Sequence, residues 1–150
     1  ITKKQAEQYI KDYFETYPKV KEYMDSLVEM GKSKGYVTSL YGRRRPIPEL
    51  SAKNFMQRQF GERIAMNSPI QGTAADIIKI AMNRVDARLR KENMQSRLIL
   101  QIHDELLVET KIEEIEEVSH ILNEEMIHAA ALKVPLIADV KQGTTWYEAK

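Results

Sequence analysis

The sequence predicts an α+β fold, in which helices pack on a small antiparallel sheet. Three observations support this prediction. Most of the chain carries apolar residues at helical spacing. Two shorter segments, YVTSLYGRRRPIPE and LILQIHDELLVE, each contain β-prone residues around turn residues, as a hairpin does. No repeat, low-complexity tract or Pro/Gly/Ser linker divides the 150 residues, so the chain is treated as one unit.

Two helices are expected in the first 35 residues. Thr2 to Gln5 has the capping-box pattern that begins a helix. Pro18 suits the first turn of the second helix, which is expected to end near Gly31 or Gly35. The predicted apolar faces comprise Ala6, Tyr9, Ile10, Tyr13 and Phe14 in the first helix and Val20, Tyr23, Met24, Leu27 and Val28 in the second. A hairpin follows, with Tyr41-Gly42 at its turn.

A third helix is expected from about Asn54 to Asn67, because Ser68-Pro69 reads as a stop followed by a new helix start. The new helix would run to about Lys91, with a core face of Ile70, Ala74, Ile77, Ile78, Ala81, Val85 and Leu89. Residues 98–109 then predict a second hairpin with Asp104-Glu105 at or near its turn. A capping box at Thr110–Glu113 would begin a last helix, whose inward residues are Ile112, Ile115, Val118, Leu122 and Met126. Residues 135–140 are predicted to form a closing strand.

Composition and charge restrict the function classes. The chain has no cysteine, which excludes disulfides and thiolate metal sites. No apolar run reaches the length of a membrane span and no signal-peptide core is present, so a soluble intracellular protein is expected. The net charge of +1 hides segregation: residues 1–30 sum to −1, residues 31–103 to +9 and residues 104–150 to −7. A basic middle region indicates a polyanion partner, although solvated faces give the same pattern.

Three groups of side chains are candidate sites. His103, Asp104 and Glu105 lie in the most strand-like segment, where a hairpin tip would lift them out of the buried sheet. Carboxylates there suit a hard cation such as Mg²⁺, but the same residues are ordinary in turns, and one Asp is too few for metal-dependent phosphoryl transfer. The second group is Arg63, Asn67 and Gln71, spaced four residues apart.

Side chains of the second group donate hydrogen bonds, and every base pair offers acceptors at similar places in the minor groove of DNA. Such a row would check duplex shape without reading sequence, or would simply be an exposed polar face. A helix kink at Ser68-Pro69 would move Gln71 out of line with Arg63 and Asn67. The arginines on the first hairpin, Arg43, Arg44 and Arg45, fit phosphate contacts and fit a solvated loop equally well.

Taken in order, YVTSLYGRRRPIPE, ERIAMNSPIQGTAADIIKIAM and LILQIHDELLVE resemble the C-terminal part of the bacterial DNA polymerase I family (family A DNA polymerases). The similarity covers essentially all 150 residues. It implies that residues 1–48 are the C-terminal part of the fingers and residues 49–150 the C-terminal part of the palm. The implied function is template-directed addition of deoxynucleoside triphosphates to a primer 3′ end in DNA replication and repair, in the bacterial cytoplasm at the nucleoid.

The resemblance also implies residue roles. Asp104 corresponds to the carboxylate that binds both catalytic Mg²⁺ ions, Glu105 to the neighbouring acid, and His103 to a residue near the primer terminus. The implied role of Arg63, Asn67 and Gln71 is contact with the primer-template, including its minor groove.

The family's first motif, which supplies the other metal-bridging Asp, and its second motif, which grips the incoming nucleotide, match nothing in this sequence. We therefore expect the chain to be an inactive fragment of an active parent. A missing first-motif strand would leave an open sheet edge, which predicts self-association or a rearranged segment that covers the edge. The alternatives are a non-catalytic duplex DNA-binding module and a plain α+β scaffold.

Overall fold

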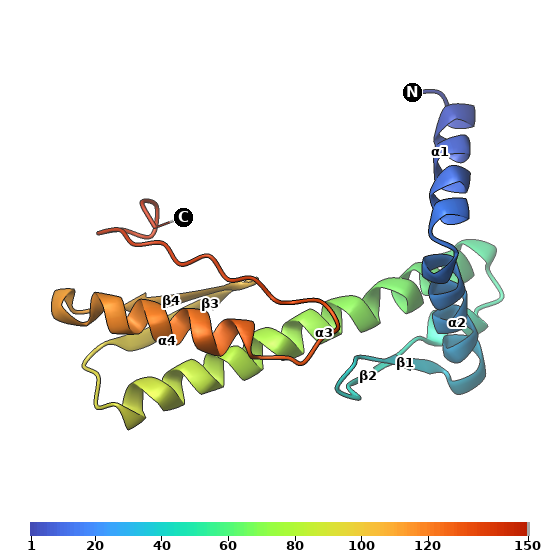
Figure 1. Cartoon of the computed structure of the whole chain (residues 1–150). Helices are drawn as coiled ribbons and strands as arrows, with labels where there is room; N and C mark the ends of the chain where they lie inside the picture. The colour runs from blue at the N-terminus through green and yellow to red at the C-terminus, as the bar shows by residue number, and fades with distance from the viewer. Residues whose placement is uncertain (150) are drawn as a thin grey trace. The chain divides into compact units, whose positions relative to one another are not determined.

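The computed structural model describes residues 1–149 and confirms the α+β class. The chain divides into two compact units, Ile1–Thr73 and Ala74–Lys150, and helix α3 (Phe55–Lys91) contributes to both (Figure 1). The described strands form two separate two-stranded antiparallel sheets, one in each unit, instead of one shared sheet. No helix among these residues has the length and apolar character needed to cross a bilayer.

The first unit begins with α1 (Lys3–Thr16) and α2 (Pro18–Lys34), as the sequence predicts. The capping box at Thr2 is formed, and α2 ends at Gly35 in the left-handed conformation, with φ 76°. The predicted apolar faces are less buried than expected. No residue of α1 is buried, and of the predicted α2 face only Leu27 is buried.

The core of the first unit lies where the hairpin meets α3. Strand β1 (Tyr36–Thr38) pairs with β2 (Arg44–Pro46), and a 3-10 turn, η1 (Pro48–Ser51), follows. The buried cluster comprises Val37, Ile47, Leu50 and Ala65, with Val28 and Ile64 packed against it. One face of the first half of α3 is therefore fixed by packing, which leaves its opposite face to solvent.

The predicted helix break at Ser68-Pro69 is wrong, because α3 continues through Pro69. Proline inside a helix removes one backbone hydrogen bond and costs roughly 3 kcal/mol. Pro69 is buried, four residues after the buried Ala65, so its ring packs on the same face as the core. The Thr73 hydroxyl also donates to the Pro69 carbonyl oxygen at 2.6 Å. Burial of the Pro69 ring therefore offsets part of the cost of the missing backbone bond.

The continuous helix also corrects the predicted core face. Ile78, Ala81, Val85 and Leu89 are buried as predicted, whereas Ile70 is 59% exposed and Ala74 is exposed too. Ile70 follows Ala65 by five residues, which places it about 140° around the helix from the buried face. Its apolar side chain therefore faces away from the core of the first unit.

The second unit packs the end of α3 and helix α4 (Ile115–Ile127) with a second hairpin (Figure 1). Strands β3 (Arg97–Ile102) and β4 (Glu105–Glu109) form the hairpin, and the 3-10 turn η2 (Ile112–Glu114) leads into α4. The core cluster is Val85, Leu89, Val118 and Ile121, with Met94, Leu106, Val108 and Leu122 packed against it.

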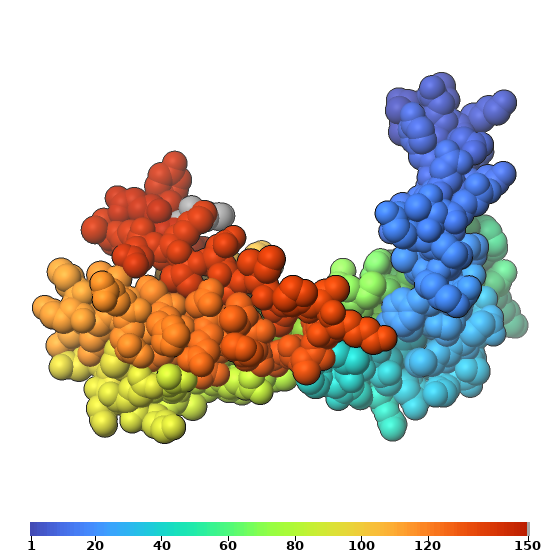
Figure 2. Space-filling model, viewed as in Figure 1, coloured from blue at the N-terminus to red at the C-terminus, as the bar shows by residue number. Residues whose placement is uncertain are grey.

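Two local predictions in this unit are wrong. The capping box at Thr110 is not formed, because the Thr110 hydroxyl donates to the Val108 carbonyl and η2 precedes α4; Ile112 is 82% exposed instead of facing inward. Residues 135–140 form no strand. A side chain holds this backbone instead, since Asn123 Nδ2 donates to the Ala138 carbonyl at 2.9 Å. The chain after α4 thus folds back along that helix (Figure 2).

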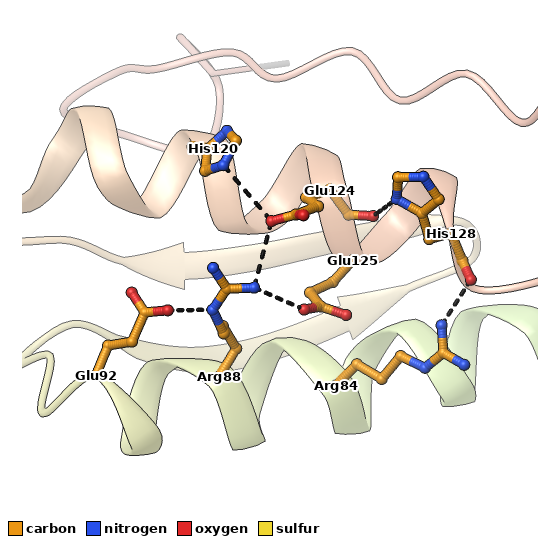
Figure 3. Close-up of polar contacts among 7 residues, drawn as sticks. All are labelled: Arg84, Arg88, Glu92, His120, Glu124, Glu125 and His128. Atoms are coloured by element: carbon orange, nitrogen blue, oxygen red, sulfur yellow. Dashed lines mark hydrogen bonds and ion pairs between the residues drawn. The ribbon is translucent and has the colours of Figure 1, made fainter.

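A polar network joins α3 to α4 (Figure 3). The Arg88 guanidinium donates to Glu92, in the turn just after α3, and to Glu124 and Glu125 on α4, the latter two at 3.3 Å. Arg84 Nη1 donates to the His128 carbonyl at 2.6 Å, just after α4 ends. These contacts connect the two helices beside the apolar core of the second unit.

Candidate functional site

The turn of the second hairpin presents the predicted carboxylates. Ile102 lies opposite Glu105 in the strand register, so His103 and Asp104 form a two-residue loop, and Glu105 begins β4. His103 has φ 52°, as two-residue hairpin loops require at their first central position. A left-handed conformation costs a non-glycine residue roughly 1–2 kcal/mol. Gln101 Nε2 donates to the His103 carbonyl at 2.6 Å, which helps to fix this backbone.

The Asp104 side chain is exposed at this turn. Among residues 1–149 its carboxylate makes no hydrogen bond or ion pair, so its oxygens are available to a ligand. Asp104 and Glu105 border a cavity of about 1150 Å³ between the hairpin, α4 and the chain after residue 136. Further carboxylates in its lining are Glu109, Asp139 and Glu148. The cavity wall is otherwise largely aliphatic.

The described carboxylates do not converge into a complete metal site. Within residues 1–149, no group of three or more His, Asp or Glu side chains is arranged to hold an ion. The exposed Asp104 carboxylate nevertheless fits the role of one ligand to Mg²⁺, which prefers oxygen and keeps several waters or phosphate oxygens.

The three predicted donors lie on the exposed face of α3 in the first unit. Arg63, Asn67 and Gln71 are all exposed, and because α3 is continuous, no helix break separates Gln71 from the other two. In the part of the chain that the structure describes, the Asn67 and Gln71 side chains form no hydrogen bond. The Arg63 guanidinium lies 5.8 Å from the ring centre of Phe60. The donors therefore remain free for an external acceptor.

The loop of the first hairpin is tied to α3 next to these donors. The Leu40 backbone N–H donates to the Thr73 hydroxyl at 2.9 Å. A Cβ added to Gly72 would lie 3.4 Å from that of Ser39, so the loop approaches the helix closely. Tight contact at Gly72 and Thr73 thus fixes the hairpin beside Gln71.

The hairpin arginines are exposed as predicted. Arg44 and Arg45 lie on β2, and Arg43 precedes it. The Arg43 backbone is fixed by the turn, because Ser39 N–H donates to its carbonyl at 2.9 Å and its own N–H donates to the Ser39 hydroxyl at 3.2 Å. The Arg44 guanidinium lies 4.9 Å from the ring centre of Tyr36. The first unit therefore brings the donor helix and the arginine hairpin together, whereas the carboxylate turn belongs to the second unit.

Sequence reasoning missed the apolar members of the donor face. Met56, Phe60 and Ile70 are exposed on α3 at helical spacing from Arg63, Asn67 and Gln71. Their spacing was readable from the sequence, but apolar residues on a helix are usually assigned to the core, as Ile70 was.

Comparisons with known proteins show the family to which the chain belongs. The family model of DNA polymerase family A matches residues 1–148. The chain is 52% identical over 150 residues to DNA polymerase I of Geobacillus stearothermophilus and 51% identical to that of Bacillus subtilis strain 168. All of this chain is covered in both cases, and it spans 17% of the length of each relative.

A solved structure is similar as well. It is described as the POL domain of Pol1 from M. smegmatis in complex with a DNA primer-template and dNTP. The TM-score is 0.95 at 40% sequence identity, and the match covers 99% of this chain and 26% of the other.

Proposed function

Because this chain belongs to DNA polymerase family A, we propose that it forms part of a template-directed DNA polymerase that adds deoxynucleotides to a primer 3′ end in replication and repair. The observation that carries the proposal is the unengaged Asp104 carboxylate on a turn with a fixed backbone. Residues 1–48 are then the C-terminal part of the fingers and residues 49–150 that of the palm. The protein would act in the bacterial cytoplasm at the nucleoid.

Asp104 is the proposed ligand to Mg²⁺, with Glu105 as a nearby acid and His103 beside the primer terminus. When bound, two Mg²⁺ ions activate the primer hydroxyl and neutralise the triphosphate. The chain's own contribution is to hold the Asp104 oxygens at the tip of a hairpin whose strands and turn are hydrogen-bonded. Since only this carboxylate matches a metal-bridging motif, the 150-residue chain by itself is expected to be inactive.

The first unit is the proposed duplex-binding part. Arg63, Asn67 and Gln71 would donate to acceptors in the minor groove of the primer-template, which occur at similar places for every base pair. Arg43, Arg44 and Arg45 would contact phosphates. The M. smegmatis complex, which contains a primer-template and dNTP, supports this choice of partners.

A chimaera tests the catalytic proposal. The 150 matching residues of the G. stearothermophilus polymerase are replaced by this chain, and primer extension is measured with Mg²⁺. The chimaera is expected to extend primers, and Asp104→Ala to lower the rate about a thousandfold or more, because a catalytic metal contributes several kcal/mol. Glu113→Ala, at an exposed carboxylate outside the turn, is the matched control. Unchanged duplex binding in Asp104→Ala would separate catalysis from binding.

Two outcomes would contradict the proposal. Full activity of the Asp104→Ala chimaera would show that Asp104 is not a ligand to the catalytic Mg²⁺. Duplex binding by the wild-type chain together with an inactive, correctly folded chimaera would favour the non-catalytic DNA-binding module.

We also propose that the isolated chain self-associates through its second hairpin. In residues 1–149, β3 and β4 pair only with each other, which leaves an outer edge on each strand. Ile99 and Leu100 of β3 are exposed there. Sedimentation velocity over a range of protein concentrations should show a species larger than the monomer, and Leu100→Lys should reduce it. A monomer at all concentrations would contradict this proposal.

A further inference from the structure

The exposed face of α3 in the first unit is a mixed stripe of polar donors and apolar side chains. It comprises Met56, Phe60, Arg63, Asn67, Ile70 and Gln71. Successive members are separated by three or four residues, except for the adjacent last pair. At about 100° per residue, all six fall within an arc of about 100°. They therefore form one continuous surface along the helix.

The apolar members of this stripe are well exposed. Met56 is 69% exposed, Phe60 49% and Ile70 59%. Phe60 also lies under the guanidinium of Arg63, so an aromatic ring and a hydrogen-bond donor are presented together. Apolar exposure of this kind on one helix face indicates a partner surface.

The chemistry of the stripe defines that partner. Its donors need acceptors at regular spacing, and its apolar side chains need a non-polar wall between those acceptors. The minor groove of duplex DNA offers base acceptors on its floor and sugar edges on its walls. Proteins that bind there combine Arg, Asn or Gln donors with apolar side chains such as Phe, Ile and Met. Residues 31–73, the part of the basic region that belongs to the first unit, carry a net charge of +6, which complements the DNA phosphates.

We propose that Phe60 and Ile70, together with Met56, are direct apolar contacts to the DNA minor groove and extend the surface formed by the three donors. Phe60 precedes the donors and Ile70 lies among them, so the contact region spans about four turns of α3. The inference rests on the proposed DNA-binding function and adds three residues to it. Their contacts are blind to base identity, because they use sugar edges and groove shape.

The same helix provides a matched control. Phe55 is 60% exposed, yet it precedes Phe60 by five residues and so lies about 140° around the helix from it. Its ring lies 5.9 Å from the Arg58 guanidinium, which donates to the Ala52 and Lys53 carbonyls. Phe55 is therefore an exposed phenylalanine of α3 outside the stripe.

The experiment measures binding of the full chain to a fluorescently labelled duplex of random sequence by anisotropy at low salt. Phe60→Ala and Ile70→Ala are each expected to weaken binding about fivefold or more, whereas Phe55→Ala stays within about twofold. Netropsin, which occupies the minor groove of A·T-rich DNA, should compete with the wild-type chain on an A·T-rich duplex. Circular dichroism of each variant checks the fold.

The outcomes distinguish this inference from the proposed function. If the wild-type chain binds no duplex, both fail. If Asn67→Ala and Gln71→Ala weaken binding while Phe60→Ala matches Phe55→Ala, only the apolar contacts are refuted. If netropsin does not reduce binding of the chain to the A·T-rich duplex, the stripe does not bind the minor groove. Loss of self-association in Phe60→Ala with unchanged DNA binding would assign the stripe to a second copy and overturn the proposal.

Discussion

One carboxylate oxygen of Glu114 lies 2.8 Å from the backbone nitrogen of Ser96 and 2.5 Å from the Ser96 hydroxyl oxygen. The same carboxylate accepts the Gln95 backbone N–H at 3.0 Å. The backbone bond from Gln95, followed by the hydroxyl bond from Ser96, lowers the pKa of Glu114 below its ordinary value of 4.5. Glu114 thus connects the start of β3 to the turn that leads into α4.

Stability of the second unit should therefore depend on pH through Glu114. The folded-state pKa is below the unfolded-state value, so the contribution is fully present above about pH 4.5 and is lost as pH falls through the folded pKa. Glu114→Gln is expected to lower the free energy of unfolding at pH 7 and to flatten its decline in acid. Urea unfolding between pH 7 and 3 measures this. The exposed Glu113→Gln is the control, and parallel curves for wild type and Glu114→Gln would contradict the prediction.

Arg88 should stabilise the second unit more than a nearby exposed arginine does. Its side chain is 28% exposed and reaches Glu92, Glu124 and Glu125, and these carboxylates raise its pKa above the ordinary value. Arg88→Met would leave the carboxylates on α4 without their cation, so we expect a clearly lower Tm. In Arg90→Met the Tm should change little, because the Arg90 side chain is 79% exposed and, among residues 1–149, pairs only with Asp86 on the same helix. Equal decreases in Tm for Arg88→Met and Arg90→Met would show that the Arg88 network does not stabilise the second unit.

Gly35 should be required at the end of α2. Its φ of 76° is left-handed, its N–H donates to the Gly31 carbonyl, and its carbonyl accepts the Ile47 N–H. Gly35→Ala is expected to lower the free energy of unfolding by about 1–2 kcal/mol, because a Cβ disfavours this conformation. Gly35→Asn should lower the free energy of unfolding less, since Asn adopts the left-handed conformation more readily than Ala does. Urea unfolding followed by circular dichroism gives both values, and an unchanged Gly35→Ala would contradict the assignment.

The hairpin arginines should appear in the salt dependence of DNA binding. Each phosphate contact steepens the plot of log K against log salt by about 0.9. Arg44→Ala and Arg45→Ala are therefore each expected to reduce the slope by about one and to weaken binding similarly for all sequences. Anisotropy titrations at several salt concentrations measure the slope. Arg90→Met is the control. An unaltered slope in Arg44→Ala would show that Arg44 does not contact a DNA phosphate.

The sequence by itself determined the features that depend on a few neighbouring residues. The cap at Thr2, an end of α2 at one of the two expected glycines (Gly35) and a hairpin with Asp104 at its turn are confirmed by the structure. Each is decided by local hydrogen bonds and by the backbone preferences of the residues involved. The three ordered motifs also predicted the family, which the family model confirms.

Only the tertiary structure decided which faces are buried and where elements continue. Pro69 remains helical and is buried on the same face as Ala65, whose core partners Val37, Ile47 and Leu50 lie 15 to 28 positions earlier in the chain. The same continuity exposes Ile70. Residues 135–140 have the composition of a strand but no strand pairs with them, and Asn123 holds their backbone instead. Burial and strand pairing depend on distant parts of the chain, so local spacing does not determine them.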